Sequence, residues 1–288
     1  MSRPAPAGLA PSRLQLVSKW PWVPSEERRE PLRQTFESAA DLYDAARPEY
    51  PPQLFEDVLE LAELEPGARL LEIGCATGKA TRPFLERGFA VTCVELGAEL
   101  AERARRNLTG LPVTIHVAPF EDWHGEPASF DLVFAATAWH WIDPQVRYES
   151  AHHLLRPGGH LAFWSAVHAF PSGFDPFFTE IQDVYDEIGE SYEDEWPPPS
   201  PEEVADDAAA VEASSLFEDV RVRRYVWERW YTADAYVALL DTFSGHIAME
   251  SEKRARLYSE VRRRIGARRD PRVLRHWFAI LHVARRRT

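Results

Sequence analysis

A glycine turn near residue 74 separates a short apolar run from a helical pattern. Leu70, Leu71 and Ile73 predict a short buried strand, and Gly74 and Gly78 bracket the turn that follows it. In α/β proteins, a strand that runs into a glycine turn and a helix N-terminus brings backbone N–H groups close to a nucleotide-like ligand. The turn therefore predicts a binding site, and the spacing of its glycines indicates the kind of ligand.

That spacing excludes two phosphate-binding motifs. A dinucleotide fingerprint that starts at Gly74 needs glycines at positions where this chain has Ala76 and Lys79. The loop of P-loop NTPases needs Ser or Thr after Gly-Lys, and here Ala80 follows Gly78 and Lys79. A ligand with a nucleoside but no pyrophosphate fits the turn.

The acidic residue Glu95 ends the next predicted strand. At this position, a carboxylate can accept hydrogen bonds from both hydroxyls of a ribose. The alternative is a solvated carboxylate at a strand end. Apolar residues within 91–94 favour ribose binding, because they bury the strand and direct Glu95 toward the crevice of the sheet.

Further segments extend this pattern along the chain. They are Phe130-Asp-Leu-Val-Phe134, Leu155-Arg-Pro-Gly-Gly159, Tyr43-Asp-Ala-Ala-Arg-Pro-Glu-Tyr-Pro51 and Ala138-Trp-His-Trp-Ile-Asp143. With the turn and Glu95, they resemble the ordered motifs of class I S-adenosylmethionine-dependent methyltransferases over residues 36–165. The last two segments resemble a narrower type-11 group of small-molecule methyltransferases, which includes trans-aconitate methyltransferase-like proteins.

The resemblance implies a cofactor, a product and a set of binding residues. The cofactor is S-adenosyl-L-methionine, the product is S-adenosyl-L-homocysteine, and the acceptor is a small molecule such as a carboxylate or hydroxyl compound. The cofactor-binding residues that it implies are Tyr43, Glu72, Gly74, Cys75, Ala76, Gly78, Glu95, Leu96, Phe120, Glu121, Asp122 and Ala136. Ala76 replaces a glycine of the family pattern. Pro119 replaces the acid that commonly meets the adenine amino group, so Glu121 or Asp122 takes that role.

His140 is the candidate catalytic residue. It follows the fourth predicted strand, at the carboxyl edge where ligands bind. Its imidazole titrates near neutral pH and could deprotonate an acceptor, or it could instead cap a helix. No metal is expected, because the spacing of His152, His153 and His160 matches no zinc site.

Four residues are candidates for binding the acceptor. Arg47 and Tyr50 belong to an N-terminal segment that closes over the site in similar proteins, and Arg47 could hold a carboxylate bidentately. Trp139 and Trp141, with Tyr43, could contact the sulfonium through cation–π interactions. The two tryptophans could equally be core residues.

The elements that position these residues alternate along the chain. Short strands are expected at 69–73, 90–95, 113–117, 130–136 and 160–165, and helices at 78–87, 98–108 and 143–155, the last with Asp143 as its cap. Together with the resemblance, this alternation predicts an α/β, Rossmann-like, doubly wound and mostly parallel sheet of seven strands. An N-terminal lid and an insertion after the fifth strand complete the expected fold.

The flanking segments differ in composition. Residues 1–35 are rich in proline and are expected to form a flexible arm, and residues 36–288 form the methyltransferase domain. Within it, helices are expected at 36–46 and 52–64. Beyond the acidic insertion or cap at 170–212, we expect a strand at 220–230, helices near 232–245 and 250–265, and a closing strand at 277–283.

The charge of the chain limits the kinds of partner that it can bind. A net charge of −13 argues against nucleic acid, and no segment is long and apolar enough to predict a membrane helix. We expect a cytoplasmic monomer or homodimer that acts on a small molecule; the alternative is a non-catalytic protein that binds S-adenosylmethionine or a nucleoside. Thirteen Asp and Glu lie in 176–212 without Lys or Arg, and thirteen Lys and Arg lie in 251–288. We therefore expect the acidic insertion to pack near the basic C-terminal helices, in the same chain or in a partner.

Overall fold

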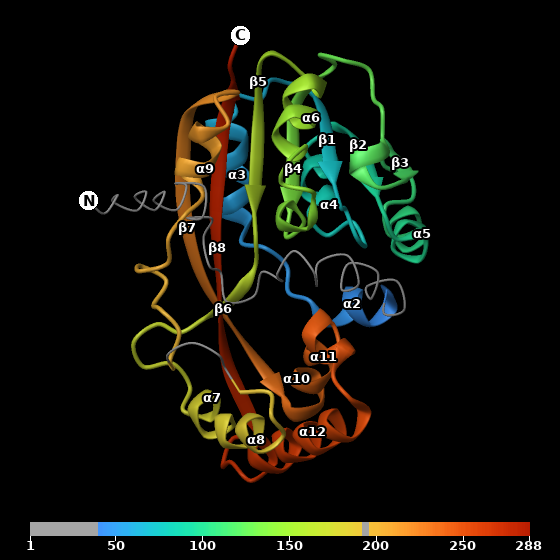
Figure 1. Ribbon diagram of the computed structural model, residues 1–288. Coiled ribbons are helices and arrows are strands. Elements are labelled where there is room, and N and C mark those ends of the chain that lie inside the picture. Colours follow the sequence, from blue (N-terminus) through green and yellow to red (C-terminus); the bar gives the residue numbers. More distant parts are fainter. Residues whose placement is uncertain (1–39, 192–195) are drawn as a thin grey trace, which may run out of the picture.

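The computed structural model describes residues 40–191 and 196–288, which are built around one sheet. Its strands are β1 (Arg69–Ile73), β2 (Ala90–Glu95), β3 (Val113–Val117), β4 (Phe130–Ala136), β5 (Leu155–Trp164), β6 (Val167–Ala169), β7 (Phe217–Thr232) and β8 (Arg272–Arg286). Their order is β3-β2-β1-β4-β5-β8-β6, with β7 paired to β8 (Figure 1). Strands β1 to β5 pair in parallel, whereas β5, β6 and β7 are antiparallel to β8. The predicted mostly parallel, doubly wound sheet is confirmed, with eight strands rather than seven in the described residues.

Both faces of the central strands are buried, and successive residues of a strand point to opposite faces. Leu70 and Phe134 pack on one side, where α3 (Pro52–Leu61), α4 (Thr81–Glu86) and α5 (Ala98–Asn107) cover the sheet. Leu71 and Val133 pack on the other side, under α6 (Arg147–Leu154) and α9 (Ala208–Ala213). None of the described helices combines the length and the apolar character that crossing a lipid bilayer requires. The arm at 1–35 and the start of the helix expected at 36 lie outside the described residues.

The connection from β4 to β5 differs from the sequence prediction. The helix expected at 143–155 begins only at Arg147, as α6. Asp143 does not cap it; instead, Asp143 Oδ1 accepts a hydrogen bond of 2.8 Å from the N–H of Gln145 and closes the preceding turn. Strand β5 begins at Leu155 rather than 160, so the two glycines at 158 and 159 lie inside the strand, beside a register shift with β4.

Strands β7 and β8 continue past the rest of the sheet and carry a second lobe (Figure 1). Their pairing runs from Phe217 opposite Arg286 to Thr232 opposite Arg272, which is longer than the two strands predicted from the sequence. The helices of the lobe are α7 (Phe177–Glu180), α8 (Gln182–Glu187), α10 (Ala233–Leu240), α11 (Ser244–Ala248) and α12 (Ser251–Gly266). Helix α2 (Ala40–Ala46) packs against α10. Phe177, Tyr236, Leu257 and Trp277 belong to the separate hydrophobic core of this lobe.

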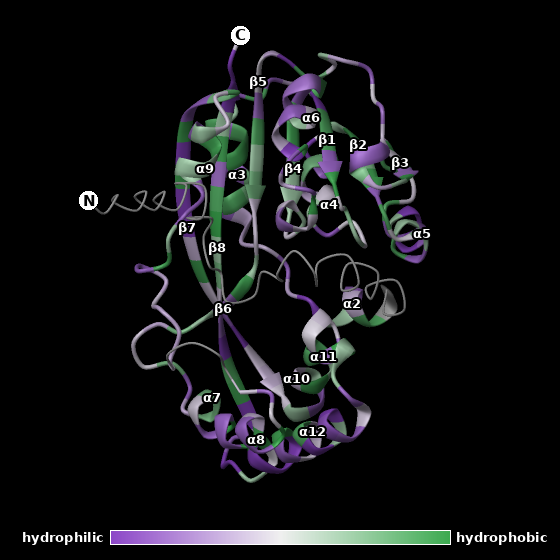
Figure 2. Ribbon diagram, in the orientation of Figure 1, coloured by the Kyte–Doolittle hydropathy of each residue, from purple (hydrophilic) through white to green (hydrophobic). Residues whose placement is uncertain are grey.

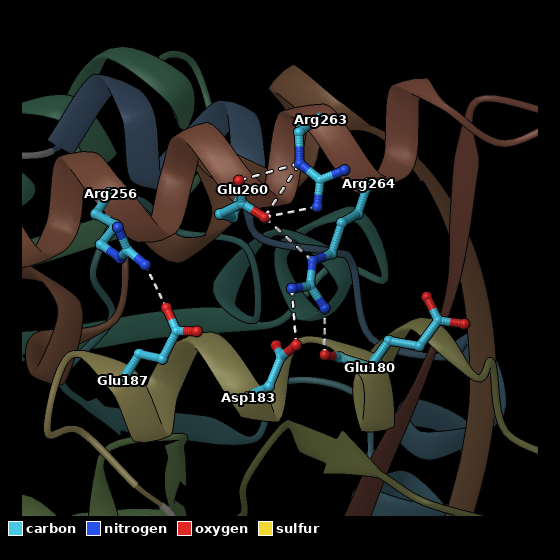
Figure 3. Close-up of polar contacts among 7 residues, drawn as sticks. All are labelled: Glu180, Asp183, Glu187, Arg256, Glu260, Arg263 and Arg264. Carbon is cyan, nitrogen blue, oxygen red and sulfur yellow. Dashed lines mark hydrogen bonds and ion pairs between the residues drawn. The ribbon is translucent and has the colours of Figure 1, made fainter.

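Ion pairs join the acidic segment to α12 within one chain (Figure 3). Arg264 lies 2.9 Å from Asp183 and also donates to the carbonyl oxygen of Glu180, while Arg256 pairs with Glu187. Helix α12 is largely hydrophilic in Figure 2, in keeping with its many arginines. The predicted packing of acidic and basic segments is therefore confirmed for α7, α8 and α12, and it occurs in the same chain.

Candidate active site

A cavity opens at the carboxyl edge of the sheet, near the ends of β1 and β4, and its space together with the adjoining open solvent measures about 430 Å³. The winding of the sheet reverses between these two strands, and open α/β sheets bind ligands at this switch point. The lining residues are Tyr43, Arg47, Pro48, Tyr50, Glu72, Gly74, Cys75, Ala76, Thr77, Lys79, Ala80, Ala136, Thr137, Ala166 and Trp277.

The glycines of the turn after β1 are required by the packing of the turn itself. Gly74 has φ +71°, and a Cβ there would lie 2.7 Å from the Cβ of Ala138. Gly78 has φ +87°, and its Cβ would lie 2.8 Å from Leu108 Cδ1. Ala76, between them, has φ +47°, a left-handed conformation that an L-residue adopts at some cost. The positive φ values and these close contacts therefore favour glycine at 74 and 78 in this turn.

Glu95 fixes this turn from the end of β2. Its side chain is buried, with 6% exposure, so the alternative of a solvated strand-end carboxylate is wrong. Oε2 accepts a hydrogen bond of 2.8 Å from the N–H of Ala76, and Oε1 accepts one of 2.9 Å from the N–H of Gly97. A carboxylate offers about four acceptor positions, so one side chain can serve both of these backbone donors.

Glu72 is a buried acid in the wall of the cavity, with 1% exposure. Thr81 Oγ1 donates to its Oε2 at 2.5 Å, while Oε1 has no hydrogen-bond partner among the described residues. Burial, chiefly, raises the pKa of this carboxyl from 4.5 to about 8. A buried acceptor without a donor is costly, and a ligand with an N–H group would relieve that cost.

Thr137 is a site residue that the sequence interpretation missed. It follows β4 directly, lines the cavity and has φ +58°. Its Oγ1 lies 2.8 Å from the Tyr50 hydroxyl and accepts a hydrogen bond of 3.1 Å from the N–H of Ala166. Its place immediately after a parallel strand was the signal that could have identified it, since ligands bind at that edge.

The second lobe also reaches the cavity, which no sequence motif indicated. Trp277 of β8 lines it and is fully buried. Arg47, which also lines the cavity, donates from Nε to the Thr242 hydroxyl and from a terminal nitrogen to the Thr242 carbonyl, both at 2.8 Å. Its guanidinium carbon lies 4.2 Å from the ring centroid of Phe243. The segment around α2 is thus tied to the second lobe through its arginine.

The structure brings eight of the residues named from the sequence to the cavity. They are Tyr43, Arg47, Tyr50, Glu72, Gly74, Cys75, Ala76 and Ala136. Gly78, Glu95, Leu96, Phe120, Glu121 and Asp122 lie outside the lining. Among these, Phe120 is buried in the core, Asp122 is exposed, and Glu121 accepts a hydrogen bond of 3.1 Å from the N–H of Asp143.

The residues at 139–141 do not line the cavity either. Trp139 is a core residue rather than an acceptor contact, because its indole stacks on Phe163 with centroids 5.2 Å apart and is only 4% exposed. His140 and Trp141 are partly exposed, and their rings lie 5.0 Å apart. Burial, helped by Arg147 and Arg47, lowers the pKa of His140 to about 4, so its imidazole is neutral near pH 7.

Cys75 lines the cavity as a neutral thiol. Its pKa is raised well above the usual value by its hydrogen bond with Cys93 and by burial. Both cysteines are free and buried. Within 40–191 and 196–288, no three His, Cys, Asp or Glu side chains come together in a group that could hold a metal ion. The described site therefore presents acid, guanidinium, hydroxyl and aromatic groups to a ligand.

Comparison with known sequences matches residues 71–163 to the family described as "Methyltransferase domain". An uncharacterized methyltransferase of Mycobacterium bovis is 34% identical over 134 residues, which are 46% of this chain and 52% of that protein. A ubiquinone biosynthesis O-methyltransferase of Xanthomonas axonopodis is 36% identical over 140 residues, which are 46% of this chain and 58% of that protein. The match thus spans about half the length of these relatives.

Solved structures share the fold. A putative type II methyltransferase from Anaeromyxobacter dehalogenans has a TM-score of 0.59 and 26% identity, over 83% of this chain and 97% of that one. An N-methyltransferase of Haemonchus contortus, solved with S-adenosylhomocysteine, has a TM-score of 0.52 and 16% identity, over 89% of this chain and 60% of that one. Both similarities extend well beyond residues 71–163.

Proposed function

Because residues 71–163 belong to the methyltransferase domain family and the sheet has the class I methyltransferase fold, we propose that this protein transfers a methyl group from S-adenosylmethionine to a small molecule. The acceptor is a carboxylate, a hydroxyl compound or a similar nucleophile. The position of the cavity supports this proposal, since it lies beside the glycine turn at the switch point of the sheet.

The observation that carries the proposal is the unpartnered Oε1 of Glu72 in the cavity wall. An ammonium group, such as that of the methionyl part of the cofactor, would donate to this oxygen and would favour the ionised carboxylate. Glu95, at the end of the neighbouring strand β2, would receive the ribose hydroxyls. These two acids lie on neighbouring strands, and Glu95 adds to the rise in the pKa of Glu72.

The chain contributes binding, orientation and exclusion of water. When bound, S-adenosylmethionine supplies an electrophilic methyl group on a positively charged sulfur. Tyr43, Tyr50 and Trp277 give the cavity aromatic walls, and such walls favour a cation over bulk water by up to about 2 kcal/mol. Orientation of two reactants in such an enclosure can lower a barrier by about 7–11 kcal/mol.

Calorimetric titration with S-adenosylmethionine and S-adenosylhomocysteine tests the proposal, followed by a screen for methyl transfer. We expect both compounds to bind, and Glu72→Gln to weaken them by about tenfold or more, because a hydrogen bond to a charged group is lost. Glu60→Gln is the control, since Glu60 is exposed on α3, away from the cavity. Failure of both compounds to bind would refute the proposal. Binding without transfer to any acceptor would favour the non-catalytic alternative.

A further inference from the structure

Two arginines meet at one aromatic ring where the second lobe closes the cavity. The guanidinium carbon of Arg47 lies 4.2 Å from the ring centroid of Phe243, and that of Arg275 lies 5.3 Å from the same centroid. Arg275 also lies 4.4 Å from the ring centroid of Trp277, which lines the cavity. The sequence interpretation named Arg47 but not Arg275, because Arg275 falls just before the strand that it predicted.

Neither guanidinium is paired with a carboxylate in the part of the chain that the structure describes. Among the described residues, Arg47 donates to Thr242, through the hydroxyl and the carbonyl. Arg275 is buried, with 4% exposure, and its Nε has no acceptor among the described residues. Arg275 forms a side-chain hydrogen bond with the phenol of Tyr236, and the phenol of Tyr231 and the guanidinium of Arg47 also influence it. Burial, chiefly, lowers the pKa of Arg275, and Arg47 lowers it further.

Other arginines of the second lobe do have carboxylate partners. Arg268 forms an ion pair of 2.9 Å with Asp175, and Arg262 forms one of 2.8 Å with Asp234. These arginines are more exposed than Arg275, and yet each has an acid. Burial of a charge without a partner costs several kcal/mol, and cation–π contacts return about 2 kcal/mol at most. Next to the cavity, the second lobe therefore holds positive charge that no carboxylate of the described residues neutralises.

We propose that the acceptor carries an oxyanion group, a carboxylate or a phosphate ester, and that Arg47 and Arg275 bind it at the edge of Phe243. This inference rests on the proposed function. The planar fork of a guanidinium donates two parallel hydrogen bonds to either oxyanion. Arg275 is not itself a lining residue but contacts Trp277, which is. The other cation of the lining besides Arg47 is Lys79, which is already paired with Glu49 at 2.8 Å. Glu72 Oε1, which has no hydrogen-bond partner among the described residues, suits a cationic group rather than an anion.

Binding of small aromatic probes tests this proposal. Protein saturated with S-adenosylhomocysteine is titrated with benzoate, phenyl phosphate and neutral benzamide. We expect at least one anion to bind and benzamide not to bind. Binding of benzoate alone identifies a carboxylate site, and binding of phenyl phosphate alone identifies a phosphate site. Equal binding of benzamide and the anions would overturn the proposal.

The variants are Arg275→Met, Arg47→Gln and the control Arg268→Gln. We expect the first two to weaken anion binding about 10- to 100-fold, as loss of a charge-assisted hydrogen bond predicts, and the control to leave it unchanged. Arg275→Met should also raise the midpoint of thermal unfolding without ligand, since it removes an uncompensated buried charge. This gain separates loss of binding from failure to fold.

The cofactor has a carboxylate of its own, which the same titrations address. If the Arg47 and Arg275 variants weaken S-adenosylhomocysteine tenfold and leave anion binding unchanged, the arginines serve the cofactor and the proposal is overturned. If S-adenosylhomocysteine does not bind to the wild-type protein, the proposed function fails, and titration of the ligand-free protein with the anions still decides whether the arginines form an oxyanion site.

Discussion

The backbone N–H of Ala76 donates a hydrogen bond of 2.8 Å to the carboxylate of Glu95, so the end of β2 holds the turn that follows β1. The same carboxylate also receives the N–H of Gly97 at 2.9 Å. One side chain therefore shapes the turn that lines the cavity. Changes at Glu95 should consequently affect folding as well as binding.

Glu95→Gln should lower the free energy of unfolding in the absence of ligand. An amide oxygen can serve only one of the two backbone N–H groups well, and a buried donor without an acceptor costs about 1–3 kcal/mol. Urea denaturation at neutral pH measures the change, with the exposed Asp122→Asn as the control. Wild-type stability in the Gln variant would show that the carboxylate does not hold the turn.

The matched pair Gly74→Ala and Ala76→Gly should have opposite effects on stability. At Gly74, a Cβ would lie 2.7 Å from Ala138 Cβ and φ is positive, so we expect a loss of about 1–3 kcal/mol. At Ala76, φ is +47°, and glycine should be neutral or stabilising by up to about 1 kcal/mol. Thermal unfolding compares the two, and an equal loss in both variants would contradict the geometry of the turn.

Glu72 should make stability depend on pH between 4.5 and about 8. The pKa of its carboxyl is raised over this window in the folded protein, so the folded protein keeps a proton that the unfolded chain has released. This stabilisation is complete below pH 4.5 and is lost as the pH rises through about 8, by at most about 1.4 kcal/mol per pH unit. The Glu72→Gln variant has no carboxyl group at this position that could gain or lose a proton. The stability of the wild type relative to this variant should therefore decrease from about pH 5 to pH 8 in urea denaturation. A constant difference would mean that the acid is already ionised.

His140→Ala should leave the pH profile of methyl transfer unchanged between about pH 6 and pH 9. The pKa of His140 is lowered to about 4, chiefly by burial, so its imidazole does not titrate in this range. The side chain also does not line the cavity. A general base contributes about 100-fold or more to a rate, so a loss of that size in steady-state kinetics would restore His140 as the base.

Arg264→Gln should destabilise the protein more than Arg256→Gln. The Arg264 side chain is 18% exposed and contacts Asp183, Glu260 and the carbonyl of Glu180 (Figure 3). The Arg256 side chain is 59% exposed, and its ion pair in the described part of the chain is with Glu187. An exposed pair is worth about 0–1 kcal/mol and is screened by salt. Urea denaturation at low and high salt checks both points. Equal losses in the two variants would show that the network around Arg264 adds nothing.

The central strands could be predicted from the sequence because each is a short apolar run bounded by turn residues. The limits of β1 to β4 agree with the prediction, and the order of glycine turn, strand and acid pointed to the edge of the sheet at which the cavity lies. The helix before β5 could not be placed correctly, because the side chain of Asp143 forms a turn with Gln145 instead of a helix cap. Local composition does not distinguish these two uses of an aspartate.

The sequence by itself determined the doubly wound sheet, the glycine turn and the acids beside it, because these depend on hydrophobic periodicity and short-range spacing. Only the tertiary structure decided which of the named residues share a cavity. It placed Trp139 in the core, brought Thr137 to Tyr50, and set Arg275 beside Arg47 across Phe243. Arg47 and Arg275 are far apart in the chain, and they meet only because β8 extends past the sheet and its lobe closes over the segment around α2. Such a contact depends on packing between distant segments, which no local pattern encodes.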